Sequence, residues 1–229
     1  MVLFLTLLSG ICWTIVYIES IHIGFKNKTY AMPLFALALN VTWEGLYAFI
    51  GLNSNLGSPQ AWINLCWFLL DMIIVYSYFK FGRDDFSKYV NKEYFVPVSL
   101  FIFIMSFAIE YSFYVEFAEN GPVYSAYVQN LIMSILFIFM LINRKSTKGQ
   151  NLIIAVSKGI GTLAPTISTG IIIGNQFVLV LGIFCAIFDI AYIVYLSTLN
   201  KVSISNSDSF ILKSNSQMDS SFNSQDLFQ

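Results

Sequence analysis

The chain has 229 residues, of which 57% are hydrophobic and only 11% are charged, and its mean hydropathy is +0.70. A soluble domain carries about 25% charged residues, so this composition excludes a soluble globular domain and indicates a polytopic membrane protein. The net charge of -1 gives no electrostatic basis for binding nucleic acid. One His and three Cys cannot form a standard zinc site without carboxylates, so we predict no metal and no cofactor.

Seven apolar stretches follow one another along the chain, each about 20 residues long, which is the length that crosses a hydrocarbon core as α-helix. Their ranges are 2–21, 30–52, 60–80, 95–115, 123–142, 152–173 and 176–199. The first lacks a basic leader and a small-residue cleavage site, so we expect a retained helix. The sequence therefore predicts an all-α fold, a seven-transmembrane-helix bundle over residues 1–200, and a disordered Ser- and Asn-rich tail over residues 201–229.

Basic residues alternate between the loops. The loops after the first, third and fifth stretches and the tail, together with Lys80 at the end of the third stretch, hold eleven of the twelve Lys and Arg, and the other loops hold none. The positive-inside rule then predicts the N-terminus outside and the C-terminus in the cytoplasm. The membrane is that of the endoplasmic reticulum in a eukaryote or the cytoplasmic membrane in a bacterium. Lys158 lies inside the sixth stretch, where we expect it to snorkel to the cytoplasmic interface, with pairing to an acid as the alternative.

Four carboxylates lie within the apolar stretches: Glu44, Asp71, Glu110 and Asp189. An ionisable group at membrane depth costs several kcal/mol and marks a functional-site hypothesis. At about 1.5 Å per helical residue, Glu44, Asp71 and Asp189 fall within roughly 5 Å of the midplane. Glu110 falls nearer the outer face.

Polar and aromatic residues share the helix faces of these acids at i, i+3, i+4 and i+7 spacing. Because lipid offers such side chains no partner, we expect them to line an enclosed cavity with acids at mid-depth and aromatic walls. The predicted substrate-binding residues are Asn40, Trp43, Tyr47, Asn64, Trp67, Asp71, Glu110, Gln129, Asn130 and Tyr192. For Asn64, Asp71, Glu110, Gln129 and Asn130 the alternative is a structural role, as hydrogen bonds that tie helices together.

Three segments carry a family resemblance. Residues 40–47 read NVTWEGLY, residues 128–134 read VQNLIMS, and residues 189–192 read DIAY. With seven short-looped spans, they resemble the small integral-membrane terpene cyclases of fungal meroterpenoid and indole-diterpene biosynthesis. The resemblance covers the seven stretches but not the tail. It implies cyclisation of a prenyl chain, often at its terminal epoxide, started by protonation, with Glu44 and Asp189 as the catalytic pair.

The residues fit this chemistry on independent grounds. Burial favours the neutral carboxylic acid, so Glu44 is suited to donate a proton, while Asp189 is suited to keep it protonated or to bind the epoxide oxygen. Aromatic faces such as Trp43, Tyr47 and Trp67 stabilise carbocations, and a dry cavity protects them from water. No diphosphate leaves, so no metal is needed. The expected partners are a lipophilic prenylated substrate that enters from the lipid bilayer, and an upstream prenyltransferase or epoxidase.

Two other classes of function remain open from the sequence. A seven-helix receptor shares the predicted topology, but the outer loops are short and contain no cysteine. A proton- or cation-coupled transporter uses mid-membrane acids equally well. The lack of visible internal repeats counts against the transporter, and we prefer the enzyme.

Overall fold

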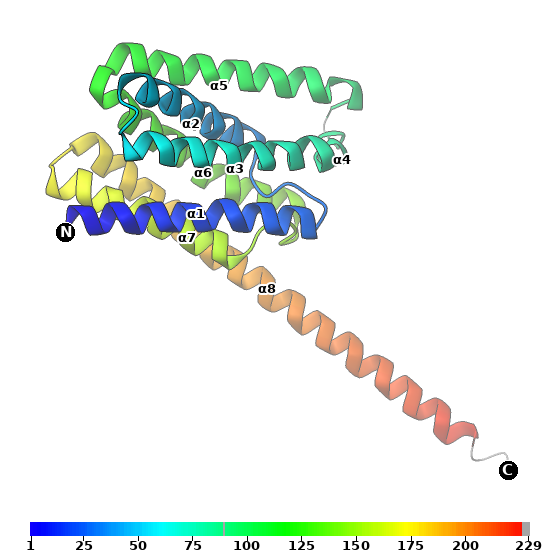
Figure 1. Ribbon diagram of the computed structural model, residues 1–229. Helices are drawn as coiled ribbons and strands as arrows, with labels where there is room; N and C mark the ends of the chain where they lie inside the picture. Colours follow the sequence, from blue (N-terminus) through cyan, green and yellow to red (C-terminus); the bar gives the residue numbers. More distant parts are fainter. Residues whose placement is uncertain (89, 226–229) are drawn as a thin grey trace.

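The computed structural model describes residues 1–88 and 90–225. Within these residues the regular secondary structure is helical, and there is no strand. The long helices are α1 (Val2–Lys26), α2 (Leu34–Ser54), α3 (Pro59–Phe81), α5 (Phe95–Phe117), α6 (Gly121–Arg144), α7 (Leu152–Pro165) and α8 (Gln176–Gln225). The short ones are α4 (Arg83–Phe86), η1 (Lys92–Tyr94), η2 (Ala118–Asn120) and the π-helical η3 (Thr166–Ile172), which continues α7. The long helices gather in one bundle, from which the end of α8 projects (Figure 1).

Six segments are long and apolar enough to cross a membrane, and one of them, Lys92–Arg144, has 53 residues and contains both α5 and α6. The described residues thus hold six to seven such helices. Their outer faces are apolar: Phe101 and Ile104 are 64% and 68% exposed. Polar side chains such as those of Glu44, Asp71 and Asp189 are buried inside the bundle. This distribution matches a hydrocarbon surrounding, and the all-α membrane fold is confirmed.

The helix ends follow local sequence signals. The Ser58 side chain accepts a hydrogen bond from the backbone N–H of Ala61, and Pro59 opens α3 behind this cap, as expected for proline in a first turn. The predicted start of the second span at residue 30 was wrong by four residues, because α2 begins at Leu34. Pro33 precedes it with a ψ of 139°, outside the helical region.

Helix α8 continues beyond the apolar segment, which ends at Lys201, and runs to Gln225. Figure 1 shows this extension leaving the bundle. Residues 226–229 lie outside the described residues, and the disorder of the 201–229 tail stays a prediction.

Packing places α2 and α6 at the centre of the bundle. Helix α2 contacts α3, α5 and α6, while α6 also contacts α8. Helix α1 contacts α3 and α7, and α7 contacts α8. One core of buried side chains runs through these contacts, from Tyr17 in α1 through Phe137 in α6 to Tyr192 in α8. Helix α8 packs closely on η3, because a Cβ on Gly182 would lie 2.2 Å from Thr166 Cγ2.

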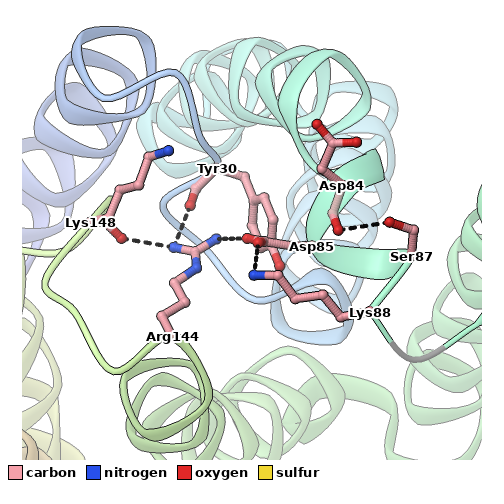
Figure 2. A network of polar contacts seen from close by, with 7 residues as sticks. All are labelled: Tyr30, Asp84, Asp85, Ser87, Lys88, Arg144 and Lys148. Carbon is pink, nitrogen blue, oxygen red and sulfur yellow. Dashed lines mark hydrogen bonds and ion pairs between the residues drawn. The ribbon is translucent and has the colours of Figure 1, made fainter.

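Three loops meet at one end of the bundle in a network of polar contacts (Figure 2). Arg144, at the end of α6, donates hydrogen bonds to the carbonyl oxygens of Tyr30 at 3.0 Å and Lys148 at 2.9 Å, and its guanidinium lies 3.2 Å from Asp85. Lys88 also pairs with Asp85, at 2.7 Å. Burial raises the pKa of Asp85, but these two cations outweigh it and hold that pKa below its ordinary value. The loops after α1, α3 and α6 therefore lie on the same side of the bundle.

Candidate active site

Glu44 lies in a buried hydrogen-bond cluster formed by α1, α2 and α3. Its Oε1 atom accepts a hydrogen bond from the Tyr17 hydroxyl and a second, at 3.3 Å, from Asn40 Nδ2. Asn40 Nδ2 also donates to Asp71 Oδ2 and to the Tyr17 hydroxyl oxygen, both at 2.8 Å. Because Asn40 lies one turn before Glu44 on the same face of α2, one amide joins two carboxyl groups from different helices. We call these four residues the Glu44 cluster.

Each carboxyl of the Glu44 cluster has one bonded and one open oxygen. Glu44 Oε2 and Asp71 Oδ1 are both buried and have no hydrogen-bond partner among the described residues. Buried polar atoms are nearly always paired, so each exception calls for an explanation. Each of these two oxygens therefore keeps an unused hydrogen-bonding site inside the bundle.

Aromatic rings cover the Glu44 cluster on the α1 and α3 side. The Tyr17 ring centroid lies 5.9 Å from that of Trp67 and 6.2 Å from that of Trp13. Trp67 is held in place by a hydrogen bond from its Nε1 to Thr14 Oγ1 at 3.1 Å. The cluster thus combines carboxyl groups with indole and phenol faces, which suits a site for positive charge.

Asp189 lies in a second buried cluster, formed by α6, α7 and α8. Lys158 Nζ lies 2.8 Å from Asp189 Oδ1 and donates to Ser134 Oγ at 2.6 Å. Asp189 Oδ2 and the neighbouring Tyr192 hydroxyl are buried without partners among the described residues. The Tyr192 ring packs against Phe137, with centroids 5.5 Å apart. We call Ser134, Lys158 and Asp189 the Asp189 cluster.

The expected snorkelling of Lys158 was wrong. Its side chain is 0% exposed and its ammonium group is paired with Asp189 inside the bundle. Its side chain points from α7 toward α8 and not toward the membrane interface, because its ammonium group contacts Asp189 of α8. The alternative, pairing with a cavity acid, is the arrangement that the structure has.

The two clusters border one core but come from different parts of the bundle. Tyr17 of the first cluster and Tyr192, beside the second, belong to the same set of packed buried residues. Helix α6 contacts both α2 and α8, and so connects the helices that carry Glu44 and Asp189. That both acids act on one bound molecule stays a prediction.

Glu110 lies in a third polar region, between α5, α2 and α6. It is 1% exposed and lies near Tyr47. The Tyr47 ring lies 5.1 Å from that of Trp43, whose Nε1 donates to the carbonyl oxygen of Pro122 at 3.0 Å. Trp43 and Tyr47 are therefore associated with Glu110 and α6, whereas Trp67 is associated with the Glu44 cluster.

The remaining predicted residues have varied surroundings. Asn64 Oδ1 accepts a hydrogen bond from Gln60 on its own helix at 2.8 Å. Gln129 Oε1 and Asn130 Oδ1 are buried and lack partners within the described part of the chain. The backbone carbonyl of Asn130 accepts from Ser134 at 2.9 Å, which ties that turn of α6 to the Asp189 cluster.

Burial of the polar faces follows the predicted helical spacing. Residues Asn40, Glu44, Tyr47, Asn64, Asp71, Tyr78, Ser106, Glu110, Cys185, Asp189 and Tyr192 are all buried. Trp43 and Trp67 on these faces are partly buried, and Tyr114, one turn after Glu110, is 38% exposed. Two participants were not expected: Tyr17, whose sequence signal was its place one turn after Trp13, and Ser134, one turn after Asn130.

A cavity of about 450 Å³ lies between α2, α3 and α5. Its lining is apolar and consists of Val41, Thr42, Gly45, Leu46, Phe68, Met72, Val75, Phe79, Leu100, Phe103 and Phe107. Leu100 and Phe107 are about half exposed, at 52% and 50%. The cavity therefore opens toward the surface that the bilayer covers, next to the turn of α2 that carries Glu44.

Comparison with known proteins gives the family. Residues 1–201 match the family of Pyr4-like transmembrane terpene cyclases. The chain is 28% identical to the Pyr4-family terpene cyclase mfmH of Annulohypoxylon moriforme and 27% identical to asnovolin H synthase nvfL of Aspergillus novofumigatus, with 69% of this chain and 66% and 65% of those proteins covered. It is 24% identical to the terpene cyclase pyr4 of Aspergillus fumigatus, with 83% of both chains covered.

The first two of these relatives are longer, and the chain spans just under two thirds of their length. No solved structure matches the chain. The match over residues 1–201 includes all seven predicted spans and both acid clusters, so the resemblance indicated by the three sequence segments is confirmed. The chain belongs to the family of Pyr4-like transmembrane terpene cyclases.

Proposed function

We propose that this protein is a membrane terpene cyclase that starts cyclisation of a prenyl chain by protonating an epoxide or an alkene on a lipophilic terpenoid or meroterpenoid substrate. Its family membership supports this reaction, and several of its relatives are named as terpene cyclases. The family match does not favour the transporter or the receptor.

The observation that carries the proposal is the geometry of the Glu44 carboxyl. Oε1 accepts two hydrogen bonds, from Tyr17 and Asn40, whereas Oε2 has no partner among the described residues. A neutral carboxyl donates through one oxygen and accepts through the other. The two donors on Oε1 therefore favour a proton on Oε2, the oxygen that is open to a ligand. Asp71 adds a second carboxyl, which disfavours a negative charge on Glu44.

The reaction then balances as an isomerisation. The Oε2 proton moves to the epoxide oxygen, and the carbon–oxygen bond at the more substituted carbon breaks. The π electrons of the nearest alkene form the new carbon–carbon bond and pass the positive charge along the chain. A proton then passes from carbon to the Glu44 carboxylate, which restores the acid and leaves an alkene, so no atom is gained or lost. Acid catalysis by a positioned group contributes typically 10²- to 10⁴-fold.

The surroundings of the acid suit the cation that follows. The Tyr17 hydroxyl contacts Glu44 and the Tyr17 ring packs against Trp67, and cation–π attraction to such rings is strongest when water is excluded. We assign substrate placement to Asn40, Asp71 and Trp67 around Glu44, and to Tyr192, Gln129 and Asn130 around Asp189. Trp43, Tyr47 and Glu110 form a third region, and Asn64 is assigned a part in the α3 wall.

The proposal extends to topology and partners. We assign seven spans with the N-terminus outside and the C-terminus in the cytoplasm, because the basic loops after α1, α3 and α6 meet on one side of the bundle (Figure 2) and positive residues stay cytoplasmic. A eukaryotic protein would then reside in the endoplasmic reticulum. The substrate enters sideways from the bilayer, for which the cavity beside α5 offers an apolar route. An upstream prenyltransferase or epoxidase supplies it.

Turnover in membranes tests the function. Membranes from cells that express the full chain are incubated with epoxidised and non-epoxidised prenylated phenolic substrates, and products are analysed by mass spectrometry and chromatography. A cyclase yields a product of unchanged mass and new retention time. Membranes with Glu44→Gln protein should yield far less. If neither substrate class is isomerised by wild-type membranes that contain folded protein, the proposed reaction is wrong for these substrates.

A further inference from the structure

Lys158 is a basic residue placed deep in the bundle. It lies between the start of α7 at Leu152 and its continuation η3, and its side chain is 0% exposed. An ammonium group inside a membrane protein is expensive to bury and marks function or a charge partner. Nothing in the acid-initiated step proposed for Glu44 requires this residue, so its presence calls for a separate explanation.

Three helices fix the ammonium group. Its contacts are Asp189 Oδ1 in α8 at 2.8 Å and Ser134 Oγ in α6 at 2.6 Å. The Ser134 hydroxyl donates in turn to the carbonyl oxygen of Asn130 at 2.9 Å, so it presents a lone pair to Lys158. This chain of donors and acceptors holds the ammonium group against Asp189 from two neighbouring helices.

Only one oxygen of the Asp189 carboxyl is paired with a described residue. Lys158 occupies Asp189 Oδ1, while Oδ2 is buried and without a partner in the described part of the chain. A carboxyl held by a charge-assisted hydrogen bond is favoured as the anion. Buried Asp189 is therefore suited to present a negative oxygen inward, next to the Tyr192 hydroxyl, which is likewise open.

We propose that Lys158 is a positioning residue that keeps Asp189 ionised and turns its Oδ2 toward the substrate, so that Asp189 stabilises the carbocation and does not act as the starting acid. This inference rests on the proposed cyclase function. It divides the work between the clusters: Glu44 holds the proton that starts the reaction, and Asp189 holds the negative charge that attracts the positive charge as it moves. A fixed charge of this kind needs no reorganisation during the reaction.

A purely structural ion pair is the alternative. Buried pairs are often replaceable by apolar groups without loss of stability. In that case Lys158 would hold α7 to α8 and have no effect on turnover by folded protein. The two roles differ in the protonation state of Asp189 and in kcat per folded molecule, and both quantities are measurable.

The experiment uses the full chain in lipid nanodiscs and five proteins besides the wild type. These are Lys158→Met, Lys158→Arg, Asp189→Asn, the double variant Lys158→Met with Asp189→Asn, and Lys92→Met. The last removes a lysine that pairs with Asp84 at an exposed site and serves as the matched control. Infrared difference spectra report the carbonyl stretch of protonated carboxyl groups, and kinetics report kcat and KM for folded protein.

We expect Asp189→Asn to remove no protonated-carboxyl band from the wild-type spectrum. Lys158→Met should gain one such band, and the double variant should lose that band again. Loss of a preorganised charge typically costs about 100-fold or more in kcat, so Lys158→Met should show that loss with a much smaller change in KM. Lys158→Arg, which keeps the charge, should recover part of the rate, and Lys92→Met should match the wild type.

Two results would overturn the inference. One is a protonated-carboxyl band that disappears in Asp189→Asn, because Asp189 is then neutral in the wild type. The other is wild-type kcat in folded Lys158→Met. If Lys158→Met does not fold, the Asp189→Asn spectrum and the Lys158→Arg kinetics decide instead, with a rate for Lys158→Arg no better than that of Asp189→Asn counting against the role. The spectra need no substrate, so failure of the cyclase proposal is distinguishable from failure of this one.

Discussion

Replacing Glu44 by Gln separates acid catalysis from folding. Gln keeps an amide oxygen where Oε1 accepts from Tyr17 and Asn40, but it puts an amide in place of the oxygen that carries the transferable proton. Losing a positioned acid costs at least about 100-fold in rate, which is about 2.7 kcal/mol in activation free energy. Because the hydrogen bonds to Oε1 remain, the free energy of unfolding should change by less than about 1.5 kcal/mol, the net contribution of one hydrogen bond.

The assay compares membranes that contain equal amounts of folded protein, quantified after mild solubilisation, under saturating substrate. Glu119→Gln is the matched control, since Glu119 lies exposed in η2 at the edge of the bundle. Glu110→Gln should cause a smaller loss than Glu44→Gln. A wild-type rate for Glu44→Gln at equal protein level would mean that Glu44 is not the acid, and the assignment carried over from the family would fail at its central residue.

Three further predictions follow from single contacts. Tyr17→Phe removes a hydrogen-bond donor to the Glu44 carboxyl and should lower kcat by about 10-fold. It should also destabilise the protein by about 1–3 kcal/mol, which is the cost of leaving buried partners unsatisfied. Kinetics measure the first effect, and thermal unfolding in detergent measures the second. Gly182→Ala should lower the melting temperature, because its Cβ would lie 2.2 Å from Thr166 and overpacking costs about 1–3 kcal/mol, whereas Gly10→Ala, with no atom within 4 Å, should not. The pKa of Asp85 is held below its ordinary value of 3.8, so the native state binds fewer protons at this group than the unfolded state does. The stability that Asp85 contributes is therefore present above pH 3.8 and is lost as the pH falls further. Asp85→Asn should flatten this acid limb of a plot of melting temperature against pH, and an unchanged limb would contradict the ion pairs in Figure 2.

The bundle was largely predictable from the sequence because span length and apolar content depend on the bilayer, which is the same for every helix. The predicted spans 60–80 and 176–199 begin within one residue of α3 and α8. The error at residue 30 has a local cause. Apolar residues precede Pro33, but its φ and ψ place it outside the helix, so the chain there forms a loop.

The sequence predicted how deep the site residues lie in the membrane, but not which neighbouring helix each helix face contacts. Sequence spacing places Glu44 and Asn40 on one face, and their hydrogen bond follows from that spacing. It does not say which helix a face meets, so pairing of Lys158 with an acid was only the alternative to snorkelling, and Asp189 was not singled out as its partner. Tyr114 shows the same limit, since α5 packs against α2 and α6 at the edge of the bundle and its far side remains exposed.

The buried pair between Lys158 and Asp189 also constrains how the chain enters the membrane during synthesis. α7 emerges first, and a lysine raises the insertion free energy of a helix by about 2.5–3.5 kcal/mol at its centre, which is the upper limit for Lys158, four residues from the midpoint of the span Leu152–Ile172. Its partner arrives only with α8, after a connection as short as the three residues between Ile172 and Gln176. So short a link lets the two helices enter the bilayer together as a hairpin, with their charges already matched. We therefore expect a chain truncated before α8 to leave α7 poorly inserted. Helices α1 to α3 contain the whole Glu44 cluster and reach the membrane before Lys158 and Asp189 are synthesised.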